Sequence, residues 1–179
     1  MLVTKRSAAI SQLEAAISIW FEEGDTVAIH TLTVAAHDCF NALLEHGTKM
    51  PSLVNKIHKS QSRGYQDRVR MPQNFFKHGK RDLKATLIHI PVYTDMMMLD
   101  AVRCYQKLEP GNPRVLLEMF TVRMFYEHSH LITEEAKPQF LEFLRIEQLH
   151  GTTRNEFLER AFPIFSKRYG FGEIHPFTP

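Results

Sequence analysis

The chain has 179 residues, 44% of them hydrophobic, which is typical of one compact domain with a single core. A formal net charge of only +2 excludes the strongly cationic surface of a protein that coats DNA, although it permits a local basic patch. The N-terminal residues lack the apolar core of a signal peptide, and no apolar run approaches the length that spans a bilayer, so a cytoplasmic location is expected.

Hydrophobic periodicity predicts two long helices at the start of the chain. Apolar residues recur at helical spacing over residues 7–23, and Gly24 provides a stop. Asp25 is a good N-cap for a second helix, whose apolar stripe continues to Gly47. Cys39, in this stripe, is expected to be a buried, reduced thiol.

The region after the second helix is more broken. A short helix is predicted at 52–59, and Pro72 opens another that ends before Gly79. Residues 86–90 have the composition of a strand, but an isolated strand of that length lacks a pairing partner, so an extended connector is expected.

Four more helices are predicted in the second half of the chain. Pro91 opens a central helix that contains Cys104, a second expected buried thiol. The others are expected at 112–127, starting with Asn112-Pro113, at 133–149, and from Thr153 to about residue 170. Together these segments predict an all-α single domain of six or seven helices over residues 1–170, with an extended tail at 171–179 that docks on its own or a neighbouring subunit.

Charge is distributed unevenly along the sequence. Nine basic residues and two acidic ones lie between Lys56 and Lys84, a net charge of +7 that leaves −5 for the rest of the chain. This asymmetry favours an anionic partner such as RNA, a nucleotide or a phosphorylated metabolite. It is equally typical of a solvated basic surface that faces an acidic surface of the same fold or of a second subunit. With the apolar tail, it predicts a homodimer.

Polar side chains line one flank of the second predicted helix. With about 100° between successive residues, His30, Thr33, His37 and Asn41 lie beside the apolar stripe. This places them at the expected boundary between the core and water. A histidine there keeps a ring nitrogen free, and burial or a nearby carboxylate can move its pKa.

Two short motifs resemble a group of small helical bacterial proteins that has no assigned function. The first is Ala28-Ile29-His30-Thr31-Leu32, and the second is Asn74-Phe75-Phe76-Lys77-His78, followed by Arg81-Asp82. The resemblance spans residues 10–108 and implies a helical shape, but no reaction.

These motifs suggest a binding cleft between the second helix and the basic turn. Our hypothesis is that His30 and His78 face one cleft, where Lys77 and Arg81 hold an anionic group and Asn74 orients it. The full predicted ligand-binding set is His30, His37, Asn74, Lys77, His78 and Arg81. The alternative is that these polar groups only stabilise the core and a loop. The signatures GxSxG, GxxxxGK[ST], HExxH and GxGxxG are absent, so no cofactor is expected and the reaction, if any, stays open.

A second hypothesis is a HEPN-like RNA-binding or RNA-cleaving protein. Domains of that type carry an Arg followed after four to six residues by a His, facing a dimer cleft. The chain has such spacings from Arg123 to His128 and His130, from Arg145 to His150, and from Arg168 to His175. His30 and His37 are seven residues apart, about two helical turns, which is too far for both to bind one ion, so no metal site is expected.

Overall fold

The computed structural model describes residues 2–47, 71–77 and 83–170. Within these ranges every regular element is a helix, so the predicted all-α class is confirmed. The elements are α1 (Lys5–Phe21), α2 (Thr26–Gly47), a short helical segment at 71–77, α5 (Pro91–Leu108), α6 (Val115–Glu127), the 3-10 turn η1 (Ser129–Leu131), α7 (Lys137–Ile146) and α8 (Arg154–Arg168). The predicted helix at 52–59 and the tail at 171–179 lie outside the described residues.

Helix starts follow from local capping. Both α1 and α8 begin with a capping box, formed by Thr4 with Ser7 and by Thr153 with Glu156. Pro91 occupies the first turn of α5, as predicted. The predicted start of α6 at Asn112 is wrong, since α6 begins at Val115. Asn112 instead closes a turn with Glu109 and accepts a hydrogen bond of 2.7 Å from the Tyr105 hydroxyl at its carbonyl. That bond ties the α5–α6 connection to α5.

The turn between α1 and α2 is a Schellman motif. The amide of Gly24 donates to the carbonyl of Ile19 over 2.9 Å, and the amide of Glu23 donates to Trp20 over 3.2 Å. The left-handed residue is Glu23, with a φ of 55°, where a glycine is usual. Gly24 is needed for another reason, because a Cβ there would lie 2.7 Å from Ile19 Cγ2.

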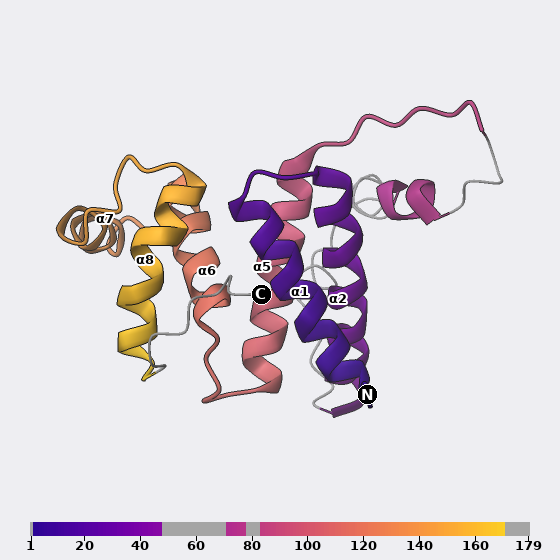
Figure 1. Cartoon of the computed structure of the whole chain (residues 1–179), viewed down its shortest axis with the longest axis horizontal. Coiled ribbons are helices and arrows are strands. Elements are labelled where there is room, and N and C mark those ends of the chain that lie inside the picture. Colours follow the sequence, from indigo (N-terminus) through magenta and orange to yellow (C-terminus); the bar gives the residue numbers. More distant parts are fainter. Residues whose placement is uncertain (1, 48–70, 78–82, 171–179) are drawn as a thin grey trace.

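The helices form two packed groups. In Figure 1, α1 and α2 run antiparallel beside α5, while α6 and α8 pair on the other side of α5. Contacts between α2 and α5 advance in the same direction along both helices, from His30 with Thr94 to His37 with Asp100. These two helices are therefore parallel, which requires the long crossover between them. Helix α7 lies at the periphery.

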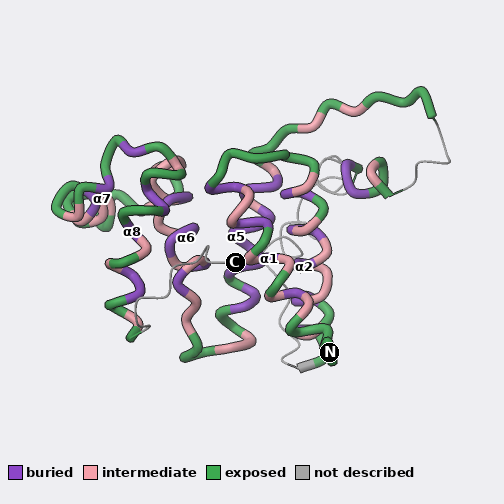
Figure 2. Tube along the Cα trace, viewed as in Figure 1, coloured by how far each residue is buried: buried purple, intermediate pink, exposed green. Residues whose placement is uncertain are grey.

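Aromatic rings join the two groups in one core. The buried residues of Figure 2 line the inner faces of the helices. Trp20 makes edge contacts with Phe21 and Phe120, at centroid distances of 5.1 and 4.9 Å. Phe21 stacks on Phe157 of α8 at 6.2 Å. Helix α1 thus links α8 and α6 to the α2–α5 pair.

Helix α2 is an exception to the sequence expectation that no apolar run approaches the length that spans a bilayer. Its window Thr26–His46, with a mean hydropathy of 1.2, is long and apolar enough to cross a membrane by length and composition. Half of that window is buried inside the bundle, where α2 packs on both α1 and α5. Burial between two neighbouring helices accounts for its apolar composition.

Candidate functional site

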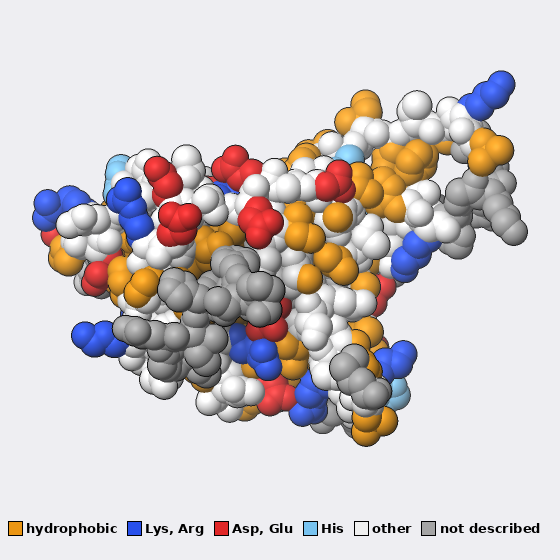
Figure 3. All heavy atoms as spheres, in the orientation of Figure 1, with side chains coloured by type: hydrophobic (Ala, Val, Ile, Leu, Met, Phe, Trp, Pro, Cys, Tyr) orange, Lys and Arg blue, Asp and Glu red, His pale blue; other side chains and the backbone are white. Residues whose placement is uncertain are grey.

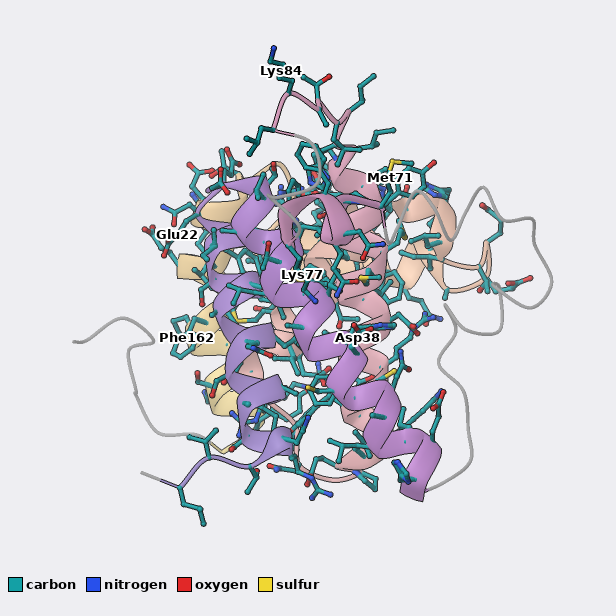
Figure 4. The ribbon with its side chains drawn as sticks, turned by 90° about the vertical axis from the view of Figure 1, so that its right-hand side faces the viewer. Glu22, Asp38, Met71, Lys77, Lys84 and Phe162 are labelled. Carbon is teal, nitrogen blue, oxygen red and sulfur yellow. The ribbon has the colours of Figure 1, made fainter. Side chains whose placement is uncertain are left out.

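A pocket of about 420 Å³ opens where α1 and α6 end and α2, α5 and α8 begin. The α1–α2 turn, the first turns of α5 and α8 and the end of α6 surround it. Its lining residues are Trp20, Glu23, Gly24, Thr26, Ile29, Pro91, Thr94, Asp95, Glu127 and Arg154. Acidic side chains gather over this end of the molecule in Figure 3, and Glu22, labelled in Figure 4, lies at the same end. The pocket lining contains three carboxyl groups and one guanidinium.

Asp95 is the buried carboxyl group of this pocket. Its side chain is only 7% exposed, and Oδ1 accepts a hydrogen bond of 3.0 Å from the Trp20 indole nitrogen. Burial raises the pKa of Asp95, while the nearby positive charge of Arg154 acts in the opposite direction. A carboxyl group with a raised pKa in a concave site is a candidate for ligand binding or proton transfer.

The opposite wall is an ion-pair network centred on Glu127. Arg154 binds both oxygens of Glu127 at 3.0 and 2.6 Å, and Arg123 Nε donates to Glu127 Oε1 over 2.8 Å. Burial acts to raise the pKa of Glu127, but hydrogen bonds from the two guanidinium groups outweigh burial and lower it. The Arg154 guanidinium also lies over the Trp20 ring, 3.7 Å from its centroid. Arg154 is thereby held in place as part of the pocket wall.

Thr94 connects the pocket to a buried histidine of α2. The ring Nδ1 of His30 lies 2.8 Å from Thr94 Oγ1, and His30 is 1% exposed. Burial, with a further contribution from the charge of His89, lowers the pKa of His30 to about 4, so the ring is neutral at pH 7. His30 Nε2 and both ring nitrogens of His89 are buried without a hydrogen-bond partner among the described residues. The two rings make an edge contact, with centroids 5.3 Å apart.

A second polar group lies further along the α2–α5 interface. His37 Nε2 is 2.9 Å from Asp100 Oδ2, and Asn41 Nδ2 is 3.1 Å from His37 Nδ1. The Cys104 thiol is 3.9 Å from Asn41 Oδ1. All four side chains are buried, and burial raises the pKa of Cys104 to about 12, with the charge of Asp100 adding to the effect. Both free cysteines are thiols, but only Cys104 is fully buried, whereas Cys39 is partly exposed.

The polar flank of α2 does not lie at the boundary with water, as the sequence predicted. His30, Thr33, His37 and Asn41 are buried, because the parallel helix α5 covers that flank. The hydrophobic periodicity of α2 does not indicate that the chain crosses over and packs α5 against this flank. We predicted that His30 and His37 lie in a cleft open to solvent, but the structure places both in the buried interface between α2 and α5.

The NFFKH motif does fold against α2, although through a phenylalanine. Phe76 makes an edge contact with His30, with centroids 5.8 Å apart, and Gln73 Nε2 donates to Asp38 over 3.3 Å. Asn74 and Lys77 are exposed, and Figure 4 shows Lys77 over α2 near Asp38. The remaining predicted ligands, His78 and Arg81, lie outside the described residues.

Sequence reasoning missed the pocket residues Trp20, Asp95, Glu127 and Arg154. They come from four separate helices and form no motif. One signal was present, since Asp95 and Asp100 are acidic residues within a helix that is otherwise predicted to be central and apolar. An acid at such a position is rarely buried without a partner.

The Arg–His pairs are not equivalent in the structure. The Arg123 guanidinium points into the core, where it binds Glu127 and the carbonyl of Thr152 at 2.8 Å each. Arg145 and His150, by contrast, share the lining of a second hollow of about 520 Å³ with Arg160. The last pair includes His175, which is outside the described part of the chain.

Comparison of this chain with models of known protein families, with curated proteins and with solved structures finds no match.

Proposed function

We propose that the protein binds a small polar molecule in the pocket between α1, α5, α6 and α8. The observation that carries this proposal is the Asp95 carboxyl group. Trp20 donates to Oδ1, and no other side chain or amide among the described residues hydrogen-bonds to Asp95. The carboxyl group lines the pocket wall, where a water molecule or a ligand can donate a hydrogen bond to it.

The charges of the pocket favour a ligand with a hydrogen-bond-donating nitrogen. Glu23, Asp95 and Glu127 oppose the single guanidinium of Arg154 in the lining, and Arg154 is already paired with Glu127. An amine, amidine or amide donates to Asp95, whereas an anion meets carboxylate repulsion. The ligand class thus differs from the anionic one expected from the sequence.

Calorimetric titration with small probes tests this proposal. Guanidinium, butylamine and acetamide are compared with acetate and phosphate, each against the wild-type protein and Asp95→Asn. We expect a donor probe to bind the wild type and to lose at least tenfold in affinity with Asp95→Asn. Asp38→Asn is the matched control, because Asp38 lies on α2 outside the pocket lining. Binding of donor probes that is equal in all three proteins contradicts the proposal.

The anionic partner predicted for the basic segment remains a separate proposal. Among the described residues predicted to bind that partner, Lys77 supplies an exposed positive charge. Its test is titration with a nucleotide such as AMP against the wild type and Lys77→Ala, where equal affinity argues against the cleft.

RNA binding or cleavage is a second candidate function, supported by the hollow that Arg145, His150 and Arg160 line together. Arg160 and His150 suit a phosphate group and a proton transfer. Arg145 is held by Glu142 of the same lining through hydrogen bonds of 2.9 and 2.7 Å. Incubation with labelled RNA tests it. Cleavage or binding that His150→Ala abolishes supports this function, and unchanged activity in that variant removes the hollow as its site.

We also propose that the protein is a cytoplasmic homodimer. Leu83 and Ile88 are 90% and 87% exposed on the segment that projects beside 71–77, where hydrophobic side chains gather in Figure 3. Exposed apolar surfaces of this kind are often buried by a second copy of the same chain in a homodimer. Light scattering that shows a dimer in the wild type and a monomer in Ile88→Lys supports this arrangement, and a wild-type monomer at micromolar concentration contradicts it.

A further inference from the structure

Three ligand-type atoms converge inside the α2–α5 interface, away from the proposed binding pocket. They belong to His37, Asp100 and Cys104, and all lie within 4.8 Å of one another. Asn41 and His37 are one helical turn apart on α2, as are Asp100 and Cys104 on α5. Parallel packing of the two helices places one pair opposite the other. The exposed fractions of the three side chains are 2%, 4% and 0%.

We propose that His37, Asp100 and Cys104 form a buried three-ligand site for a divalent transition-metal ion, zinc in preference to magnesium or calcium, with a water molecule in the fourth position of the tetrahedron. An imidazole nitrogen, a carboxylate oxygen and a thiolate sulfur are the ligand types that zinc accepts. Magnesium and calcium require sets made of oxygen atoms alone. The proposed site is independent of the function proposed above.

Charge balance supports a divalent ion at this depth in the core. One carboxylate and one thiolate carry two negative charges, which neutralise an M²⁺ ion when the imidazole is neutral. A neutral cluster avoids the large cost of burying net charge. A monovalent ion with the same three ligands leaves one uncompensated negative charge.

Protons must move when the ion binds. Formation of the metal–sulfur bond displaces the thiol proton of Cys104, which leaves to solvent. Nε2 of His37, which lies 2.9 Å from Asp100 Oδ2, then donates its lone pair to the metal from a neutral ring whose proton is on Nδ1. One proton leaves the protein for each ion bound.

Asn41 is a positioning residue for this site. Its amide nitrogen lies 3.1 Å from His37 Nδ1 and 3.4 Å from Nε2, nearer to Nδ1. With the amide oxygen turned toward the ring, it accepts the Nδ1 proton and orients His37 for the metal. Partners of this kind outside the metal's own ligands typically change affinity by about 10- to 100-fold.

Refolding the full chain in the presence of Co²⁺ tests the site, because the buried cluster is closed in the folded protein. Cobalt reports its ligands by absorption. We expect one ion per chain, a near-ultraviolet band from thiolate-to-cobalt charge transfer, visible bands of a tetrahedral ion, and one released proton. A wild type that refolds with a native circular dichroism spectrum but acquires no charge-transfer band overturns the proposal.

Two serine variants separate this site from other metal-binding groups. Cys104→Ser must lose the charge-transfer band, whereas Cys39→Ser, which changes the other thiol of the chain, must keep it. The reverse pattern overturns the proposal. Asn41→Ala is expected to retain the band with an affinity lowered about 10- to 100-fold, and an unchanged affinity removes the positioning role.

A measurement on the wild type covers the case in which Cys104→Ser does not fold. X-ray absorption of the zinc-loaded protein should show one sulfur at about 2.3 Å with nitrogen and oxygen atoms at about 2.0–2.2 Å. A first shell with nitrogen and oxygen alone contradicts the site, because it indicates surface histidines such as the neighbouring rings of His128 and His130.

Discussion

The indole nitrogen of Trp20 donates a 3.0 Å hydrogen bond to the Asp95 carboxylate, joining α1 to α5 across 75 positions of sequence. This bond fixes the buried acid at the wall of the pocket, and the same indole ring carries the Arg154 guanidinium on its face. Trp20 is therefore both a core residue and the support for the two opposite charges of the pocket.

Removal of the indole donor should destabilise the protein. Trp20→Phe keeps an aromatic ring but leaves Asp95 without its hydrogen bond, a loss of about 1–3 kcal/mol in the free energy of unfolding, in addition to lost packing. Urea denaturation followed by circular dichroism measures the change. In an Asp95→Asn background the Trp20→Phe substitution should cost less. That background has no buried carboxyl group at position 95 that could lose the indole hydrogen bond. Equal losses in both backgrounds contradict the role assigned to this bond.

Acid should weaken the fold through His30. Its pKa is about 4 in the folded protein and 6.5 when unperturbed, so the unfolded chain binds the proton more tightly. Stability from the neutral ring is complete above pH 6.5 and is lost as the pH falls from 6.5 toward 4. Through His30, the free energy of unfolding should fall by at most about 1.4 kcal/mol for each pH unit of acidification.

Urea denaturation at several pH values, on the wild type and His30→Gln, measures this dependence. The variant should have a smaller loss of stability between pH 6.5 and 4.5. His46→Gln, which removes an exposed histidine near the end of α2, serves as the control and should follow the wild type. If His30→Gln and the wild type have the same pH profile, the buried neutral ring is not the cause.

The α1–α2 turn should respond in opposite directions to substitutions at adjacent positions. Gly24→Ala places a Cβ 2.7 Å from Ile19 Cγ2 and should destabilise the protein by about 1–3 kcal/mol. Glu23→Gly relieves a φ of 55° and should be stabilising by up to about 1 kcal/mol. Thermal denaturation of both variants provides the comparison. A destabilising Glu23→Gly would indicate that the glutamate side chain contributes more than the backbone strain costs.

The two arginines of the candidate RNA motifs should differ sharply in their effect on stability. Arg123→Met removes one donor from Glu127, which keeps its pair with Arg154. It also leaves the Thr152 carbonyl short of a buried donor and should cost about 1–3 kcal/mol. Arg145→Met removes an exposed pair with Glu142 and should cost about 0–1 kcal/mol. Chemical denaturation distinguishes them, and similar small losses would show that Arg123 is not a core residue.

Local signals predicted most of the helices correctly. Pro91 and Thr153 mark helix starts in the sequence because their effects depend on neighbouring residues alone. The predicted start of α6 was too early. Asn112 lies in the connection before the helix, where its carbonyl accepts a tertiary hydrogen bond from the Tyr105 hydroxyl. Capping rules contain no information on such a distant partner.

The site was less predictable than the fold, because its residues meet only through tertiary structure. Periodicity placed His30 and His37 correctly on a flank of α2, but it contained no sign that α5 covers this flank. Contact of the NFFKH motif with α2 was expected, and Phe76 provides it. Asp95 and Arg154 share a pocket without any common spacing or motif that a sequence pattern can express.

The most direct measurement for the proposed binding site is fluorescence of Trp20, the single tryptophan of the chain, during titration with guanidinium or butylamine. Because the indole lines the pocket and bonds Asp95, a bound donor should produce a saturable change in emission in the wild type. In Asp95→Asn, the half-saturating concentration should rise at least tenfold. A wild-type emission that changes only linearly with probe concentration, as with free tryptophan, would contradict ligand binding at this pocket.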